Sequence, residues 1–425
     1  MSNSIRIAIS GGGLAGASLL HALTNFPHLD VHIFESASAF KEAGLAIGVT
    51  RNAQAALDLI SPSAPELLKR AGAVPMRGVR FMIAQGDGQG EVIDEVDDTS
   101  EGKRLTSIVH RAAYLRELLA GVPQERLHAS KKLDTVDRND DGSLTLRFTD
   151  GSTHECDILV GADGIHSTVR RLILGKDDPA ASPRNTGIWL VMTLQPYAEA
   201  QASIGQGLID AQDAREYSWI GDGNYVMHNL LSDGQLVQFV IASNDGKESD
   251  LWHRTVSSHE IKELYQGWPP HLLQAIEELL CKQPEHQAIY LWEHPPARTY
   301  ASGPLCVIGD AAHATTPWHG SGGGMSIEDS LILSTLLGRA KSRIEALAAL
   351  RAYDRVRRPR TQRIVDSSRG TGIILTGRGE DTGLQMKKSG SLLRRWDFIL
   401  DIDMGKHRNE AIELMEAELA EATSG

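Results

Sequence analysis

The stretch that decides the fold is Ile5–Gly16, which reads IRIAISGGGLAG. Its first residues are mostly β-branched or small, which predicts a buried strand, and Ala17–Leu23 predicts a helix. Between the two stand Gly11, Gly13 and Gly16 in the spacing Gly-x-Gly-x-x-Gly. One such glycine permits a tight turn, one lets the backbone approach a pyrophosphate, and one lets strand and helix pack closely. The stretch therefore predicts a dinucleotide-binding unit, although this motif alone does not distinguish NAD from FAD.

An acidic residue follows this unit at the distance that ribose binding requires. Val31–Phe34 predicts a second strand, and Glu35 ends it, 19 residues after Gly16. A carboxylate there can accept hydrogen bonds from ribose hydroxyls, while the free N–H groups at the start of the first helix face the phosphates. The residues of this unit that we predict to bind the nucleotide are Gly11, Gly13, Leu14, Ala15, Gly16, Glu35 and Ser36.

Two further motifs each follow a buried strand later in the chain. Gly161–Arg170 reads GADGIHSTVR, and Val307–Pro317 reads VIGDAAHATTP. The segment Gly320–Met325 then reads GSGGGM, and its small side chains allow the backbone to lie against a flat ring system. A helix is predicted to begin after it, and the N–H groups at its start can stabilise negative charge on a ligand.

In the order and spacing of its three motifs the sequence resembles the single-component FAD-dependent aromatic hydroxylases, and among them the salicylate hydroxylase-like members of fungal type. The resemblance spans nearly the whole chain. It implies that FAD is the cofactor and that NADPH or NADH binds only transiently, since a second dinucleotide fingerprint is missing. It also implies a monooxygenase that hydroxylates an aromatic or phenolic small molecule with O2, through a flavin C4a-hydroperoxide. A role in natural-product biosynthesis fits such an enzyme.

The resemblance also implies FAD contacts outside the first motif. It places Gly48 in a loop near the flavin, Arg111 near the ribityl chain or the pyrophosphate, and Asp310 at the ribityl hydroxyls. The other residues implied in FAD binding are Asp163, Gly322 and Gly323. Two simpler interpretations stay open from the sequence: Arg111 as a surface residue at a helix start, and Asp310 as a helix N-cap.

The predicted fold is α/β, with a doubly wound, Rossmann-like FAD-binding domain, an inserted and mainly antiparallel β-sheet for the substrate, and C-terminal helices. The inserted sheet is predicted because apolar and polar residues alternate in Ile188–Leu194, Tyr225–Leu231 and Leu236–Ala242. We expect the FAD-binding domain in residues 1–75, 104–180 and 288–370, the sheet domain in residues 76–103 and 181–287, and the tail in residues 371–425. The tail is expected to be irregular from 370 to about 395, with a final helix at Asn409–Leu419.

The substrate is expected between the sheet and the flavin. The candidate pocket residues are Met192, Trp219, Tyr225, His228, Trp318 and His319, and the candidates for catalysis are His319, His228 and Trp318. Imidazole titrates near neutral pH, so a histidine could orient or deprotonate a phenol; each could equally be a satisfied packing residue. Where many relatives carry an arginine, this chain has Leu190–Leu194 without one. A substrate that is larger or neutral is therefore favoured over a compact anion.

Hydroxylation has alternatives within and beyond this superfamily. A flavin-dependent epoxidase or another oxidoreductase of the same superfamily is the main alternative, whereas a halogenase is disfavoured because no Trp-x-Trp-x-Ile-Pro segment occurs. A dehydrogenase using the first fingerprint alone would leave the motifs around Asp163 and Asp310 unexplained. A flavin-binding protein without turnover would consume no NAD(P)H.

Composition narrows the class of partner and compartment. The formal net charge of −12 argues against nucleic acid and anionic lipid as partners. The three cysteines are far apart, which favours a reducing compartment and predicts neither a disulfide framework nor a metal site. Neither a signal peptide nor a membrane span is recognisable, so we expect a cytoplasmic protein, as a monomer or homodimer.

Overall fold

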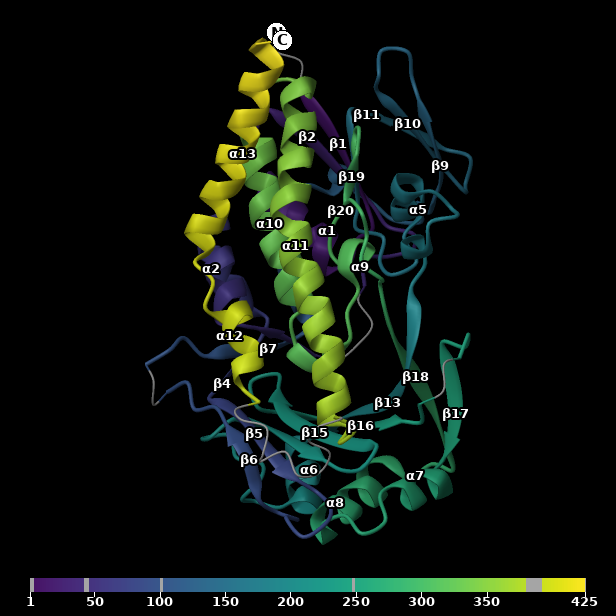
Figure 1. Ribbon diagram of the computed structural model, residues 1–425, viewed down its shortest axis with the longest axis vertical. Helices are drawn as coiled ribbons and strands as arrows, with labels where there is room; N and C mark the ends of the chain where they lie inside the picture. The colour runs from purple at the N-terminus through teal and green to yellow at the C-terminus, as the bar shows by residue number, and fades with distance from the viewer. Residues whose placement is uncertain (1–3, 42–45, 100–101, 247–248, 380–391, 425) are drawn as a thin grey trace.

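The computed structural model describes the chain except for residues 1–3, 42–45, 100–101, 247–248, 380–391 and 425. Figure 1 shows two layers of strands at opposite ends of an elongated molecule, joined by long helices and by the strands β13 (Arg184–Pro196) and β18 (Glu285–Glu293). Within the described part of the chain, none of the helices has the length and apolar character needed to cross a membrane.

The first layer is a six-stranded sheet built on the fingerprint strand. β1 (Ile5–Ser10) pairs in parallel with β12 (Ile158–Gly161) and β2 (Leu29–Phe34). The full order is β19-β20-β12-β1-β2-β8, in which the remaining strands are β19 (Ala301–Ser302), β20 (Leu305–Val307) and β8 (Leu127–His128). Strands in this sheet are apolar because helices or loops cover both faces. β9 (Leu133–Arg138), β10 (Leu144–Phe148) and β11 (Thr153–Cys156) form a separate antiparallel sheet before β12.

Helices cover this sheet and reach from it to the second layer. α1 (Leu14–Leu23) packs against α10 (Gly322–Arg339) and α4 (Arg111–Leu119). α11 (Arg343–Leu375) is 33 residues long and runs beside α13 (Met404–Ser424), as Figure 1 shows. The remaining helices at this end are α2 (Arg51–Ile60), α3 (Ala64–Arg70), α5 (Thr168–Leu174) and α9 (Asp310–His313), whereas α12 (Arg394–Leu400) lies between the two layers.

A group of buried charges joins α10 to α11. Glu328 and Asp329 of α10 and Arg357 of α11 are all fully buried. Arg357 donates from Nη1 to Glu328 Oε2 at 2.6 Å and from Nε to Asp329 Oδ1 at 2.9 Å. Glu328 also accepts hydrogen bonds from Arg360 and Asn52. Each buried charge is therefore paired, as burial of ions requires.

The second layer is an eight-stranded sheet in the order β17-β18-β13-β16-β15-β14-β5-β6. Its strands not yet bounded are β17 (His253–Ser257), β16 (Leu236–Asn244), β15 (Asn224–Leu231), β14 (Arg215–Ile220), β5 (Gly78–Ile83) and β6 (Val92–Glu95). Neighbouring strands are antiparallel except for β14 and β5, which are parallel. The alternation in the sequence thus predicted the sheet correctly, and β18 crosses residue 287, where the sheet domain was expected to end.

The two faces of this sheet have different neighbours. We define the inner face by Leu190, Ile220 and Tyr225, which share an apolar cluster with Trp318 and with Leu375 of α11. The residues at alternating positions form the outer face, among them Trp189, Tyr217, Trp219, Val226 and Phe239. The outer face is covered by α6 (Tyr197–Ile204), α7 (Ser258–Leu264) and α8 (Pro270–Ala275).

A small sheet lies between the two layers. β3 (Ala46–Val49) and β4 (Val74–Met76) both pair antiparallel with β7 (Thr106–His110). Ile108 of β7 and Leu231 of β15 belong to one buried cluster, so this small sheet contacts the inner face of the large one.

The tail differs in part from its prediction. α11 continues to Leu375, so the expectation of irregular chain from residue 370 was wrong for 370–375, because this last turn packs against the inner face of the sheet. The final helix was predicted at Asn409–Leu419 and extends from Met404 to Ser424.

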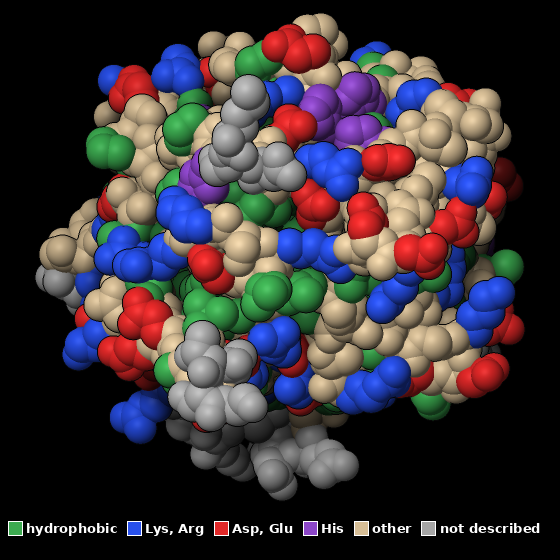
Figure 2. Space-filling view, turned by 90° about the horizontal axis from the view of Figure 1, so that it is seen from above, with side chains coloured by type: hydrophobic (Ala, Val, Ile, Leu, Met, Phe, Trp, Pro, Cys, Tyr) green, Lys and Arg blue, Asp and Glu red, His purple; other side chains and the backbone are tan. Residues whose placement is uncertain are grey.

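On the face shown in Figure 2, acidic and basic side chains are interspersed.

Candidate functional site

The glycines of the first motif allow three pieces of backbone to meet. Gly11 has a φ of +108°, and a Cβ there would lie 2.2 Å from the carbonyl oxygen of Ala162, just past β12. A Cβ on Gly16 would lie 2.0 Å from the carbonyl oxygen of Gly11. A side chain at either position would therefore force the turn open. Gly13 is the N-cap residue of α1, and Leu14 and Ala15 begin the helix.

Glu35 is attached to the same turn. Its Oε2 accepts a hydrogen bond from the N–H of Gly12 at 2.7 Å, and its Oε1 accepts one from the N–H of Ala37 at 2.7 Å. The hydroxyl of Ser36 also donates to Oε1, at 3.1 Å. Glu35 remains partly exposed and Ser36 is exposed. These bonds hold the carboxylate at the end of β2, beside the glycine turn.

Asp310 directly follows a glycine, Gly309, that lies against the first turn of α1. Gly309 has a φ of +58°, and a Cβ there would lie 2.5 Å from Cβ of Ala15. Gly309 and Ala311 are buried, yet Asp310 between them is exposed. The sharp turn after β20 thus presents a carboxylate at the edge where the fingerprint helix begins, which is the position that a cofactor spanning both motifs requires.

The small sheet contacts the glycine-rich segment. A Cβ on Gly48 of β3 would lie 3.6 Å from Cδ1 of Ile108 and 3.8 Å from the carbonyl oxygen of Gly320. A Cβ on Gly323 would lie 3.2 Å from Cδ1 of Ile47. Gly322 and Gly323 are the first residues of α10, and both remain partly exposed. Arg111, the first residue of α4, follows β7 directly and is partly exposed.

The second motif, Gly161–Arg170, stabilises α5 and α9 through hydrogen bonds. The carboxylate of Asp163 accepts hydrogen bonds from the N–H groups of Thr168 and Val169, at the start of α5. Arg170 is buried and donates to the carbonyl oxygens of Ala311 and Ala312, directly after Asp310. Burial lowers the pKa of Arg170 to about 10, so it stays charged at neutral pH. The bonds of Asp163 thus lie within its own turn, and Arg170 fixes α9.

The sequence candidates near the substrate fall on both faces of the large sheet. Tyr225 and Met192 lie on the inner face, and the rings of Tyr225 and Trp318 meet edge to face with centroids 5.3 Å apart. Trp318 is buried and packs on α11, where a Cβ on Gly372 would lie 2.2 Å from its Nε1. Trp318 therefore closes the gap between α11 and the sheet.

The two histidine candidates lie in different places: His228 is on the outer face of the sheet, and His319 is hydrogen-bonded to α11. His319 is buried, its Nε2 lies 2.7 Å from Oγ1 of Thr371, and burial lowers its pKa to about 3. His228 is on the outer face, stacked on Tyr217 with its Nε2 3.5 Å from Nε1 of Trp219. Burial lowers the pKa of His228 to about 3. Neither imidazole is charged at neutral pH.

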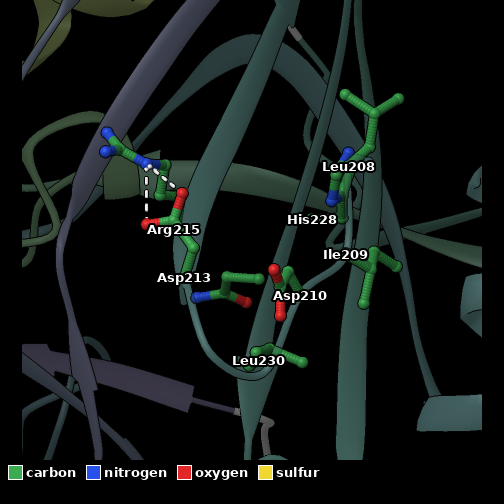
Figure 3. Close-up of a pocket in the computed structure, with 8 residues that line it drawn as sticks. Leu208, Ile209, Asp210, Asp213, Arg215, His228 and Leu230 are labelled. Atoms are coloured by element: carbon green, nitrogen blue, oxygen red, sulfur yellow. Dashed lines mark hydrogen bonds and ion pairs between the residues drawn. The ribbon is translucent and has the colours of Figure 1, made fainter. Parts of the chain in front are cut away.

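Figure 3 shows the pocket that His228 lines on the outer side, together with Leu208, Ile209 and Asp210. Leu208 and Ile209 belong to the segment that connects α6 to β14. At the start of β14, Nε of Arg215 donates hydrogen bonds to the carboxylate of Asp213. The sheet itself separates this pocket from the edge where Asp310 lies, so His228 does not share a site with Asp310.

Sequence reasoning missed a polar group on the inner face. Glu216 and Ser218 of β14 and Tyr225 of β15 are joined by hydrogen bonds, Ser218 Oγ to Glu216 Oε1 at 3.2 Å and Ser218 Oγ to Tyr225 Oη at 2.6 Å. Burial raises the pKa of the Glu216 carboxyl to about 7. The signal in the sequence was a carboxylate and a serine at alternate positions of a strand with buried aromatic neighbours.

Metal binding and thiol chemistry have no visible site in the described residues. Among them, no group of three or more His, Cys, Asp or Glu side chains is arranged to hold a metal ion. Cys156 and Cys306 are buried and Cys281 is partly buried, all three as free thiols.

Comparison with known proteins identifies the family. The family described as FAD binding domain matches residues 113–368. The 6-methylsalicylate 1-monooxygenase atA of Aspergillus terreus is 34% identical over 100% of this chain and 95% of its own length. The chain is a member of the FAD-dependent monooxygenases. The FAD-dependent monooxygenase pigN of Monascus ruber is 33% identical over 93% of this chain and 94% of its own length.

Solved structures show the same fold. A salicylate hydroxylase substrate complex superposes with a TM-score of 0.82 over 97% of this chain and 98% of that chain, at 24% identity. HpxO from Klebsiella pneumoniae, complexed with FAD and uric acid, superposes with a TM-score of 0.73 over 98% and 97%, at 22% identity. The predicted fold class is thereby confirmed, as is the assignment to FAD-dependent monooxygenases.

The residues present fit FAD. The fingerprint turn leaves no room for side chains at Gly11 and Gly16, and the exposed carboxylate of Asp310 begins beside Ala15. When bound, the flavin supplies the redox and oxygen chemistry of this family, and the protein supplies binding, orientation and electrostatics.

Proposed function

We propose that this monooxygenase hydroxylates an aromatic ring that carries a free hydroxyl group, with NAD(P)H and O2 as co-substrates. The observation that carries the proposal is the chemistry of the inner face. Its apolar positions Leu190, Met192 and Val240 form a wall for an aromatic ring, and Trp318 stands at its end. Glu216 adds an acceptor for hydrogen-bond donors on that wall.

Two amide side chains extend the set of acceptors. Asn229 and Gln238 are register partners on β15 and β16, and the alternation of both strands places them on the inner face. In the described structure, Oδ1 of Asn229 and Oε1 of Gln238 are buried without a hydrogen-bond partner. Buried acceptors of this kind are usually satisfied, so a hydroxyl-bearing ligand is a reasonable partner for them.

The same wall offers little to a carboxylate. The inward positions of β14, β15 and β16, all of which the structure describes, contain neither Arg nor Lys. A compact aromatic acid would place its charge beside Glu216 without a cation to compensate it. The relative atA is named for 6-methylsalicylate. For this chain we propose instead a neutral phenol, of the kind that natural-product pathways supply.

The proposed cofactor contacts follow the residues that converge at the edge of the first sheet. Gly11, Gly13, Leu14, Ala15 and Gly16 would receive the pyrophosphate, and Glu35 with Ser36 the adenosine ribose. Asp310 would accept hydrogen bonds from the ribityl hydroxyls, and Gly48, Gly322 and Gly323 would lie against the ring system. Arg111 would contribute positive charge, while Asp163 would act indirectly by holding α5 and, through it, Arg170.

The experiment is a turnover screen of the FAD-loaded protein. Phenol, resorcinol, catechol and their methyl ethers are added singly, and NADH and NADPH oxidation is followed together with product mass. The proposal expects faster NAD(P)H oxidation and a product heavier by one oxygen atom with the phenols. Retained FAD with no oxygenated product from any phenol would refute the proposed substrate class. Sedimentation of the same sample tests the expectation of a monomer or homodimer.

A further inference from the structure

Glu216 is the one charged residue at the inward positions of β14, β15 and β16, all of which the structure describes. Oε1 is engaged by Ser218, whereas among the described residues no side chain donates to Oε2. Glu216 stays partly exposed, although Ser218 and Tyr225 beside it are buried. A carboxylate with one oxygen anchored and the other open is suited to receive a proton from a ligand.

Neighbouring elements connect Glu216 with the small sheet that carries Gly48. Glu216 is the register partner of Val79 on β5, and Val79 packs in the cluster that contains Ile108. Ile108 in turn contacts the position of Gly48 on β3. On the other side, the hydrogen-bonded chain from Glu216 ends at Tyr225, whose ring meets Trp318. These contacts connect Glu216 to the small sheet on one side and to Trp318 on the other.

Charged groups of the adjacent strands are turned the other way. On the outer face, Arg80 and Arg215 both donate to Glu95, and Arg80 also donates to Tyr217. On the inner face, Val79 comes from β5, Asn229 and Tyr225 come from β15, and Asp94 of β6 accepts a hydrogen bond from the N–H of Leu393. Thus no cation on these strands faces the Glu216 carboxylate.

We propose that Glu216 is the general base of the reaction and removes the proton of a substrate hydroxyl, with Ser218 and Tyr225 as the residues that position it. The inference rests on the proposed function, because it requires a phenolic substrate. The O–H bond of the substrate breaks, its proton forms a new O–H bond at Oε2 of Glu216, and the electron pair stays on the substrate oxygen. The resulting phenolate donates more electron density to the ring carbons that are to be hydroxylated.

The direction of the hydrogen bonds agrees with this role. Tyr225 is protonated throughout, since burial raises the pKa of its hydroxyl. Its O–H can therefore donate to Ser218, whose O–H donates to Oε1 of Glu216. Both donors favour the ionised carboxylate. The raised pKa of Glu216, about 7, puts the base near the pH at which the cell works, where general bases are most effective.

The test compares the FAD-loaded wild type with Glu216→Gln, Ser218→Ala and the matched control Glu95→Gln, which removes a carboxylate from the outer face. Each is assayed across pH with resorcinol and with 1,3-dimethoxybenzene, which has no proton to give, and product is measured by mass. For the wild type we expect kcat/KM with resorcinol to rise with pH to a plateau, with an apparent pKa near 7. For Glu216→Gln, kcat/KM with resorcinol should fall about 100-fold or more at neutral pH. It should recover at high pH, because resorcinol then ionises by itself.

Two further outcomes separate catalysis from structure. Ser218→Ala removes a hydrogen bond that lowers the Glu216 pKa, so the rising limb should move to higher pH. Glu95→Gln should keep the wild-type profile. The role of Glu216 would be overturned, with the proposed function intact, by one pair of results. The wild type would hydroxylate resorcinol, and Glu216→Gln would keep both the rising limb and the preference for resorcinol over 1,3-dimethoxybenzene. Absence of hydroxylation by the wild type would overturn the proposed function, and this inference with it.

Discussion

The buried charges between α10 and α11 allow a stability prediction that does not depend on turnover. Arg357→Ala removes the cation that bonds both Glu328 and Asp329, and all three side chains are fully buried. Removal of one partner from a buried ion pair generally costs about 3–5 kcal/mol, since it leaves an uncompensated charge. Here Glu328 keeps Arg360, and Asp329 keeps His313, at 2.6 Å. We therefore expect the lower end, about 3 kcal/mol.

Equilibrium unfolding in urea at one fixed FAD concentration measures this loss, followed both by tryptophan fluorescence and by circular dichroism. The matched control is Arg355→Ala on the same helix, because Arg355 is more than half exposed and pairs with Glu418 across 3.5 Å. An exposed pair contributes only about 0–1 kcal/mol. Equal unfolding midpoints for the two variants would refute the reasoning, as would an Arg357→Ala protein as stable as the wild type.

Four further changes test the site. Gly16→Ala should abolish FAD retention, measured by flavin absorbance after gel filtration, because its Cβ would lie 2.0 Å from the oxygen of Gly11; retention like the wild type's contradicts this. Asp310→Ala should weaken FAD binding about 10- to 100-fold in a fluorescence titration, the value of charged hydrogen bonds, with unchanged circular dichroism. His319→Gln should leave the pH profile of turnover in place, since the imidazole is already neutral; a lost limb would make it the base. The depressed pKa of His228, about 3 against 6.5 unfolded, means that its contribution to stability is complete above pH 6.5 and is lost as pH falls toward 3. His228→Phe should therefore reduce the slope of the unfolding free energy against pH in that window by about 1.4 kcal/mol per pH unit, measured by urea unfolding at several pH values, and an unchanged slope would contradict the burial argument.

The strand, turn and helix of the first motif could be predicted from the sequence because their constraints are local. Gly11 and Gly16 are required by a turn a few residues long, and Glu35 is bonded to that turn. The motif ending in Asp310 likewise follows its strand directly. Such features depend on backbone conformation and spacing, which a single sequence records.

The substrate end could be predicted only in outline, because both faces of the large sheet are buried. Strand β15 is buried at nearly every position, so alternation does not show which residues point to the flavin. Tyr225 and His228 were therefore both candidates for the pocket, although they lie on opposite faces. His319 depended on a partner 52 residues away, Thr371, and no local pattern records such a contact.

The contact between Trp318 and Gly372 limits how this fold can diverge. The indole occupies the space that any side chain at position 372 would need, so the two sites are sterically linked although 54 positions separate them along the chain. A bulkier residue at position 372 therefore requires that position 318 first changes to a smaller residue, or changes with it.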